Sequence, residues 1–214
     1  MRNDDRVRAL ILSGGAKRAF SAGVNVNNMK DLGPLEAESF IQELHQACRG
    51  LLTLSIPAVA AIRGPCLGGA LELVLACDLR VAADDAIFGL PEVRVGVPSV
   101  IEASLLPRTI GLGRARAMIL TGETVDAQEA LQIGLVDRVV PPGELDATAT
   151  QIAHGFLAMS PHILAVQKDI IVQWLELGEE ASAEYSAKAF ALCFATDHPR
   201  RAMEAFLEKR QPEF

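Results

Sequence analysis

Residues 64–72 read Gly64-Pro65-Cys66-Leu67-Gly68-Gly69-Ala70-Leu71-Glu72, and Leu90-Pro91-Glu92 follows later in the chain. This pattern predicts a tight glycine turn that opens a helix, with one carboxylate a turn inside the helix and a second arriving from another segment. The N-terminus of a helix presents unpaired backbone N–H groups and the positive end of a dipole, which suit an oxygen that gains negative charge. Two nearby glutamates can move protons beside such an oxygen. The stretch therefore indicates an enzyme that acts next to a carbonyl group.

The bulk composition is that of an ordinary globular protein. The chain has 214 residues, of which 50% are hydrophobic and 22% are charged, so it predicts one large domain, or one domain with a helical extension, with a substantial core. The net charge of −7 and the scattered lysines and arginines argue against binding to nucleic acid or to an anionic membrane surface.

The cysteines and histidines lack the spacing of metal or disulfide sites. There is no CxxC pair and no metal-ligand spacing among the histidines, and we expect small buried thiols in a reducing cytosol at Cys48, Cys66, Cys77 and Cys193. The apolar run 73–77 stops at Asp78, well short of the roughly 20 residues that span a membrane. The charged N-terminus lacks the apolar core of a signal peptide. We therefore expect a cytoplasmic protein without metal or redox cofactor.

Strand and helix patterns alternate along the first two thirds of the chain. Apolar patterning predicts strands at 7–13, 56–62, 79–82, 86–89 and 136–140, and helices at 34–54, 68–76, 115–120 and 127–133. Asp126 with Glu129 forms a capping signal for the last of these helices, and Gly134 a stop. The alternation predicts βαβ units and a largely parallel sheet. Pro141-Pro142-Gly143 marks the exit from a core at 1–143, and 144–214 reads as consecutive helices.

Ordered motifs along almost the whole chain resemble one known family. The matching stretches are 8–14, 20–23, 57–64, 68–73, 76–78, 88–92, 120–122, 134–136 and 205–210. Together they resemble the crotonase superfamily, also called the enoyl-CoA hydratase/isomerase family. The resemblance implies an α/β fold of the ClpP/crotonase type, a superhelix of ββα turns followed by a helical trimerisation region. It also implies an acyl-CoA thioester substrate and a homotrimer or a hexamer built as a dimer of trimers.

The resemblance also assigns roles to individual residues. The backbone N–H groups of Val24 and Gly69 would form the oxyanion hole for the thioester oxygen. Glu72 would help activate water for attack at C3, while Glu92 would supply the proton at C2. Because isomerases of the family usually rely on the Glu92 position alone, the presence of both glutamates favours hydration of a 2-enoyl-CoA. We further expect contributions to substrate binding from Ala22, Gly68, Val97 and Glu102, in a pocket that also includes Met29 and Val100.

The sequence departs from the family pattern in three places. The match begins at about the family's third strand, which suggests a truncated member. Asn25 stands where many members have Asp, a difference we expect to affect only the loop. The segment 96–103 replaces a Gly-rich stretch and introduces Glu102. This residue reads either as a surface or capping group, or as a third carboxylate that alters acyl specificity or reaction type.

Other functions remain open on the sequence. Isomerisation, thioester hydrolysis and decarboxylation proceed through the same enolate, and a truncated member might be expected to act as a silent subunit. A protease of ClpP type needs a Ser/His/Asp set, which no motif of this chain matches.

Overall fold

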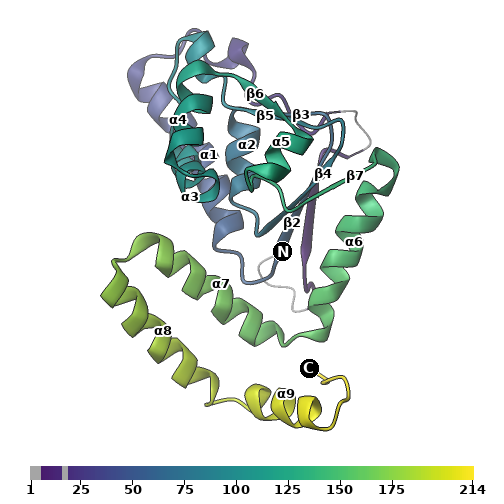
Figure 1. The fold of residues 1–214 in the computed structure, drawn as a ribbon. Helices are drawn as coiled ribbons and strands as arrows, with labels where there is room; N and C mark the ends of the chain where they lie inside the picture. Colours follow the sequence, from purple (N-terminus) through teal and green to yellow (C-terminus); the bar gives the residue numbers. More distant parts are fainter. Residues whose placement is uncertain (1–5, 16–18) are drawn as a thin grey trace. The chain divides into compact units, whose positions relative to one another are not determined.

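The computed structural model describes residues 6–15 and 19–214, and these residues fall into two compact units (Figure 1). The larger unit comprises 11–52 and 59–150; the smaller comprises the described residues up to Leu10 together with 53–58 and 151–214. This division lies within helix α6 (Leu145–Gly155), whereas the sequence placed a boundary between 143 and 144.

The larger unit contains a four-stranded sheet in the order β1-β2-β4-β7. Its strands are β1 (Leu10–Ser13), β2 (Ala58–Ile62), β4 (Leu79–Ala83) and β7 (Arg138–Val140). β2 pairs with β4 in parallel, as does β4 with β7. Every residue of β2 is buried, as expected for a parallel strand covered on both faces. The strands predicted at 7–13, 56–62, 79–82 and 136–140 are thus present, the first and last of them shorter than predicted, and the pairings of β2, β4 and β7 confirm the parallel arrangement.

A second sheet carries the motif that opened the sequence analysis. It contains β3 (Pro65–Leu67), β5 (Ile87–Gly89) and β6 (Thr124–Asp126), with β3 and β5 parallel and β5 and β6 antiparallel. Neither β3 nor β6 was predicted, because a three-residue strand is too short to show an alternating pattern.

The predicted helices of the larger unit are present with small shifts in their ends. They are α1 (Pro34–Leu52), α2 (Gly69–Leu75), α4 (Leu112–Thr121) and α5 (Ala127–Gln132), to which the structure adds α3 (Leu106–Ile110) and short 3-10 turns. The carboxylate of Asp126 accepts a hydrogen bond of 2.8 Å from the Glu129 N–H, and Gly134 follows the helix with φ +78°. Both end signals read from the sequence are confirmed.

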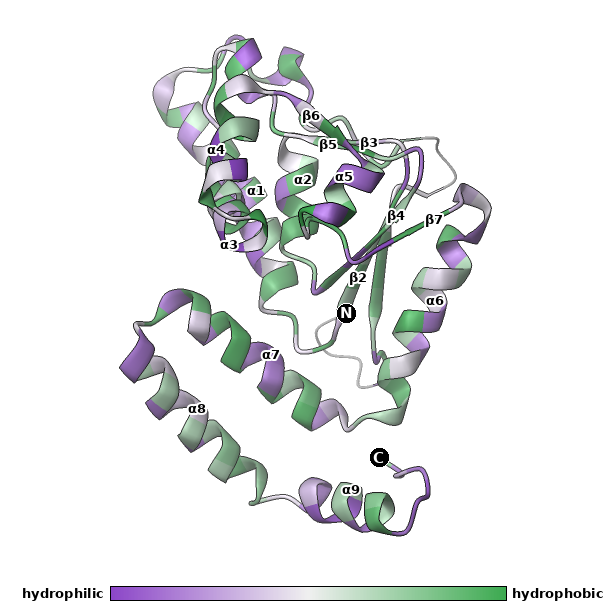
Figure 2. Cartoon of the chain, in the orientation of Figure 1, coloured by the Kyte–Doolittle hydropathy of each residue, from purple (hydrophilic) through white to green (hydrophobic). Residues whose placement is uncertain are grey.

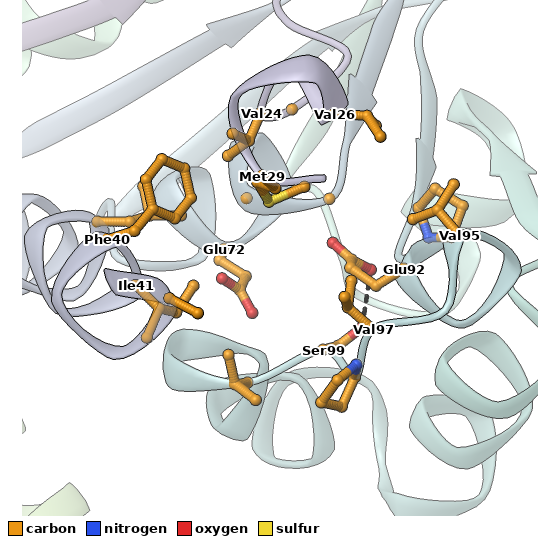
Figure 3. Close-up of a pocket in the computed structure, with 18 of the residues that line it drawn as sticks. Val24, Val26, Met29, Phe40, Ile41, Glu72, Glu92, Val95, Val97 and Ser99 are labelled. Carbon is orange, nitrogen blue, oxygen red and sulfur yellow. Dashed lines mark hydrogen bonds between the residues drawn. The ribbon is translucent and has the colours of Figure 1, made fainter. Parts of the chain in front are cut away.

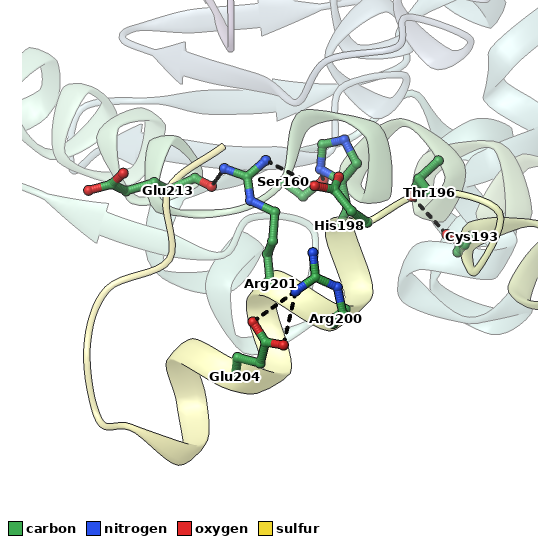
Figure 4. A network of polar contacts seen from close by, with 9 residues as sticks. Ser160, Cys193, Thr196, His198, Arg200, Arg201, Glu204 and Glu213 are labelled. Carbon is green, nitrogen blue, oxygen red and sulfur yellow. Dashed lines mark hydrogen bonds and ion pairs between the residues drawn. The ribbon is translucent and has the colours of Figure 1, made fainter.

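The smaller unit is helical, and polar contacts link its segments. After α6 come α7 (Pro161–Glu176), α8 (Glu179–Cys193) and α9 (His198–Leu207). Ser160 caps α7 by accepting from the Ile163 N–H at 3.2 Å, and its Oγ lies 2.9 Å from Nδ1 of His198 (Figure 4). Among the described residues no helix is long and apolar enough to cross a membrane.

Several large apolar side chains of the smaller unit face solvent. α8 carries hydrophobic residues through its C-terminal half (Figure 2). The exposed side chains in α8, α9 and the turn between them are Phe190, Leu192, Phe194, Met203, Phe206 and Leu207, the last two about four-fifths exposed (81% and 78%). Contiguous exposed apolar surface is uncommon on monomers.

Candidate active site

The loop that carries Val24 is fastened to β3. The Ser21 N–H donates to the carbonyl of Pro65 at 2.9 Å, and the Leu67 N–H donates to the carbonyl of Ser21 at 3.0 Å. Gly23 has φ +89°, and a Cβ there would lie 2.8 Å from the Leu67 carbonyl oxygen. Only glycine therefore lets the chain turn so close to β3.

This turn brings Val24 beside the start of α2. A Cβ at Gly69 would lie 3.7 Å from Cγ2 of Val24. Among residues 6–15 and 19–214, the backbone N–H groups of Val24 and Gly69 donate to no other group of the protein. Two free donors therefore lie on neighbouring segments.

Gly68 joins the two segments that carry the glutamates. Its N–H donates to the carbonyl of Gly89 at 2.9 Å, which ties the start of α2 to the end of β5. Its backbone angles, φ +60° and ψ −134°, suit glycine. A Cβ at this position would lie 2.7 Å from Oε1 of Glu92. The glycine thus makes room for the second carboxylate as well as for the turn.

The two glutamates share one cavity of about 640 Å³. Glu72 comes from α2 and Glu92 from the 3-10 turn η2 (Glu92–Val95), and Figure 3 shows their carboxylates on the two sides of the same space. The remaining lining is largely apolar. It comprises Ala22, Gly23, Val24, Val26, Met29, Leu32, Ala37, Glu38, Phe40, Ile41, Leu44, Gly68, Gly69, Pro91, Arg94, Val95, Val97, Pro98, Ser99 and Val100.

Glu72 is a buried acid, with 3% of the residue exposed. The Ala103 N–H donates to its Oε1 at 3.2 Å. Burial raises the pKa of Glu72 from the ordinary 4.5 to about 8, with further contributions from the negative charges of Glu92 and Glu102 that outweigh the backbone donors. Glu72 therefore keeps its proton at neutral pH when Glu92 is ionised.

Glu92 has a different environment, because a side-chain hydroxyl holds it. The Ser99 Oγ donates to its Oε2 at 2.7 Å (Figure 3). The sequence analysis gave Ser99 no part in the site. The only signal was its place in the unusual segment 96–103, since a hydroxyl in an irregular loop has no periodicity to indicate its direction.

Seven of the eight candidate residues line this cavity, and Glu102 does not. Ala22, Val24, Gly68, Gly69, Glu72, Glu92 and Val97 are on its surface. Glu102 is 4% exposed, so a surface position is wrong for it. Its carboxylate faces α1, where its Oε1 lies 2.9 Å from Nδ1 of His45, because the turn η3 (Ile101–Leu105) directs it away from the cavity.

Comparison with known proteins settles the family. The sequence profile of the enoyl-CoA hydratase/isomerase family matches residues 1–214. The chain belongs to this family. It is 36% identical to a short-chain-enoyl-CoA hydratase of Clostridium acetobutylicum, over 99% of this chain and 81% of that protein. It is also 36% identical to a crotonyl-CoA hydratase of Syntrophomonas wolfei, over 99% of this chain and 82% of that protein.

Solved structures of the family share the fold. Pseudomonas aeruginosa DspI superposes with a TM-score of 0.94 at 34% identity, covering 100% of this chain and 82% of that one. An enoyl-CoA hydratase of Bacillus anthracis gives a TM-score of 0.92 at 31% identity, over 100% and 83% of the two chains. The predicted crotonase-type α/β fold is confirmed.

Proposed function

We propose that this chain is an enoyl-CoA hydratase, which adds water across the C2–C3 double bond of a 2-enoyl-CoA to give a 3-hydroxyacyl-CoA. The observation that carries the proposal is the pair of carboxylates, Glu72 and Glu92, in one apolar cavity beside two free backbone donors. The similarity to a short-chain-enoyl-CoA hydratase and to a crotonyl-CoA hydratase supports the same reaction.

The N–H groups of Val24 and Gly69 would receive the thioester oxygen. This oxygen gains negative charge as water attacks C3, and donors aimed at it in a largely apolar cavity stabilise the transition state more than they stabilise the ground state. Loss of one such donor typically costs about 3 kcal/mol. Backbone donors make few demands on side chains, so Val24 can be apolar.

The carboxylate pair would move the protons. Hydration needs one proton acceptor, for the water that attacks C3, and one proton donor, for C2. A pair that holds one proton meets this need, and the raised pKa of Glu72, caused first by burial and then by the charge of Glu92, supports such a pair. The reacting form of the pair is the tautomer with the shared proton on Glu92. In it Glu72 accepts a proton from the water that attacks C3, Glu92 gives its proton to C2, and the proton on Glu72 then passes to Glu92 for the next turnover.

This chemistry balances without an oxidant or reductant, since water is the only co-reactant. Among the described residues no group of three or more His, Cys, Asp and Glu side chains is placed to hold a metal ion. The absence of a cofactor remains a prediction from the reaction type.

Loss of the conjugated enoyl-thioester absorbance of crotonyl-CoA tests the proposal. We expect rapid loss with the parent protein and at least about a hundredfold slower loss with either Glu72→Gln or Glu92→Gln. Turnover that survives Glu72→Gln while C2 exchanges hydrogen with solvent would instead indicate isomerase chemistry. Binding of crotonyl-CoA without any turnover would contradict the hydratase assignment, and absence of binding would favour a silent family member.

We also propose that the exposed apolar side chains of α8 and α9 pack in a homotrimer or a hexamer of this chain. Six large apolar groups in one helical region support burial by further copies. Light scattering after size exclusion should give a mass of three or six chains, and Phe206→Glu should lower it. A monomer at all concentrations would overturn this assignment.

We also propose that the protein is cytoplasmic, as the sequence predicts. All four cysteines are buried free thiols, which supports a reducing compartment.

A further inference from the structure

A buried ionisable cluster lies behind the cavity and is not used by the proposed chemistry. Glu102 is 4% exposed, and its Oε1 lies 2.9 Å from Nδ1 of His45, whose side chain is 46% exposed. The other carboxylate oxygen, Oε2, is buried without a hydrogen bond from the described part of the chain. Burying a carboxylate with so few partners is costly, so its position next to a catalytic acid calls for an explanation.

The backbone connects Glu102 directly to Glu72. The next residue, Ala103, donates its N–H to Oε1 of Glu72 at 3.2 Å. The preceding residue, Ile101, has φ +37°, a strained left-handed conformation for a β-branched side chain. The turn η3 is therefore held directly after the strained residue, by Glu102 against α1 and by Ala103 against α2.

Titratable and charged groups near Glu102 come from α1, α2 and α3, and α1 also carries the half-buried Arg49. α1 presents His45 and Cys48, and α2 presents Glu72; Arg108, the charged residue of α3, is exposed. Burial, followed by the charge of Glu102, raises the pKa of the Cys48 thiol far above its ordinary value. The thiol is thus neutral, and as a weak donor it brings no compensating charge. His45 is positive only when protonated.

We propose that His45 and Glu102 are positioning residues that hold a negative charge behind Glu72, and that this charge keeps the catalytic proton on the carboxylate pair. His45 acts through Glu102: its ring nitrogen, 2.9 Å from Oε1, holds the buried carboxylate in place. Glu102 acts through Glu72 by its charge, which opposes the effect of the neighbouring Ala103 N–H on the Glu72 carboxylate. This inference rests on the proposed function only for its kinetic readout.

The kinetic test is the pH profile of kcat/KM for crotonyl-CoA. Glu102→Gln keeps the shape of the side chain and an acceptor for His45 but removes the charge, so the alkaline limb should move to lower pH by about half a unit to one unit. His45→Ala should move it in the same direction, and the double variant no further than Glu102→Gln alone. His45→Gln, which keeps a donor, should restore most of the parent profile. Glu43→Gln, an exposed charge change on α1, is the matched control.

A direct titration separates this inference from the hydratase proposal. Carbon-13 NMR of glutamate carboxyls, with Glu72 assigned by its loss in Glu72→Gln, gives the pKa of Glu72 without any turnover. A lowered pKa in Glu102→Gln and His45→Ala supports the positioning pair even if the reaction proves to be another. An unchanged Glu72 titration in a folded Glu102→Gln or His45→Ala protein overturns it. If Glu102→Gln does not fold, the comparison of His45→Ala with His45→Gln decides.

Discussion

Replacing Glu72 with Gln should abolish activity and yet stabilise the protein at neutral and alkaline pH. Folding moves this carboxyl from an ordinary pKa of 4.5 to about 8. A group whose pKa is higher in the folded state adds stability below the unfolded value, and that contribution is lost as pH rises through the folded value. The loss therefore runs from about pH 4.5 to about pH 8. Gln has no such titration, and its Oε1 can still accept from the Ala103 N–H.

The size of the effect follows from the two pKa values. At about 1.4 kcal/mol for each unit, ionising Glu72 costs the folded protein about 3 kcal/mol more at pH 8 than at pH 5. No discount for solvent screening applies, because only 3% of Glu72 is exposed. The free energy of unfolding of Glu72→Gln minus that of the parent should rise by this amount between the two pH values.

Urea unfolding followed by circular dichroism, at equal protein concentration, measures this difference. Titrating groups that do not interact with Glu72 contribute equally to both proteins and cancel, whereas the coupled carboxylates of Glu92 and Glu102 do not. Glu43→Gln controls for removing a charge. Parent and Glu72→Gln curves that stay parallel from pH 5 to pH 8 would refute the reasoning, since Glu72 would then titrate alike in the folded and unfolded chains.

Three further outcomes are expected. The kcat/KM for crotonyl-CoA should fall as pH rises through about 8, because the carboxylate pair loses its proton there; a profile that rises through this range would contradict the shared proton. Ser99→Ala removes the donor to Glu92 and should lower kcat about tenfold with little change in KM. Ser99→Thr keeps a hydroxyl and should retain activity. Equal kcat values for the two variants would exclude a positioning role for Ser99. Gly68→Ala should lower kcat/KM at least about a hundredfold and destabilise the fold, because the added Cβ would lie 2.7 Å from Oε1 of Glu92. The control is Gly143→Ala, whose Cβ would meet nothing within 4 Å and which should leave both properties unchanged. Near-parent kinetics of Gly68→Ala would disprove the close packing.

Much of the site was predictable because its parts have strong local signals. Gly68, Gly69 and Glu72 are close in sequence, and a helix start fixes their arrangement. Glu92 follows a strand that runs parallel to β3, so pairing of β3 and β5 brings it to the same edge. The resemblance to a family supplied Val24, whose approach to Gly69 depends on pairing between segments far apart in sequence.

The segment after Glu92 was not predictable in the same way. Residues 96–103 form neither a periodic helix nor a strand, so nothing local sets the directions of Ser99 and Glu102. Ser99 turns toward Glu92, and Glu102 turns toward His45, because of the strained backbone at Ile101 and the packing of η3. These are long-range contacts, and hydrophobic patterning carries no information about them.

The hydrogen bond from Gly68 to Gly89 has a consequence for how such a protein can diversify. It locks both acidic segments to one small sheet, so their spacing does not depend on the loops and the helix that enclose the acyl chain. Those walls, drawn from residues 26–44 and, apart from Ser99, from 94–100, can change in bulk while the reacting groups keep their places. In the proposed hydratase, the groups that react and the walls that would set the preferred chain length therefore lie in separate segments, so one set could be exchanged without rebuilding the other.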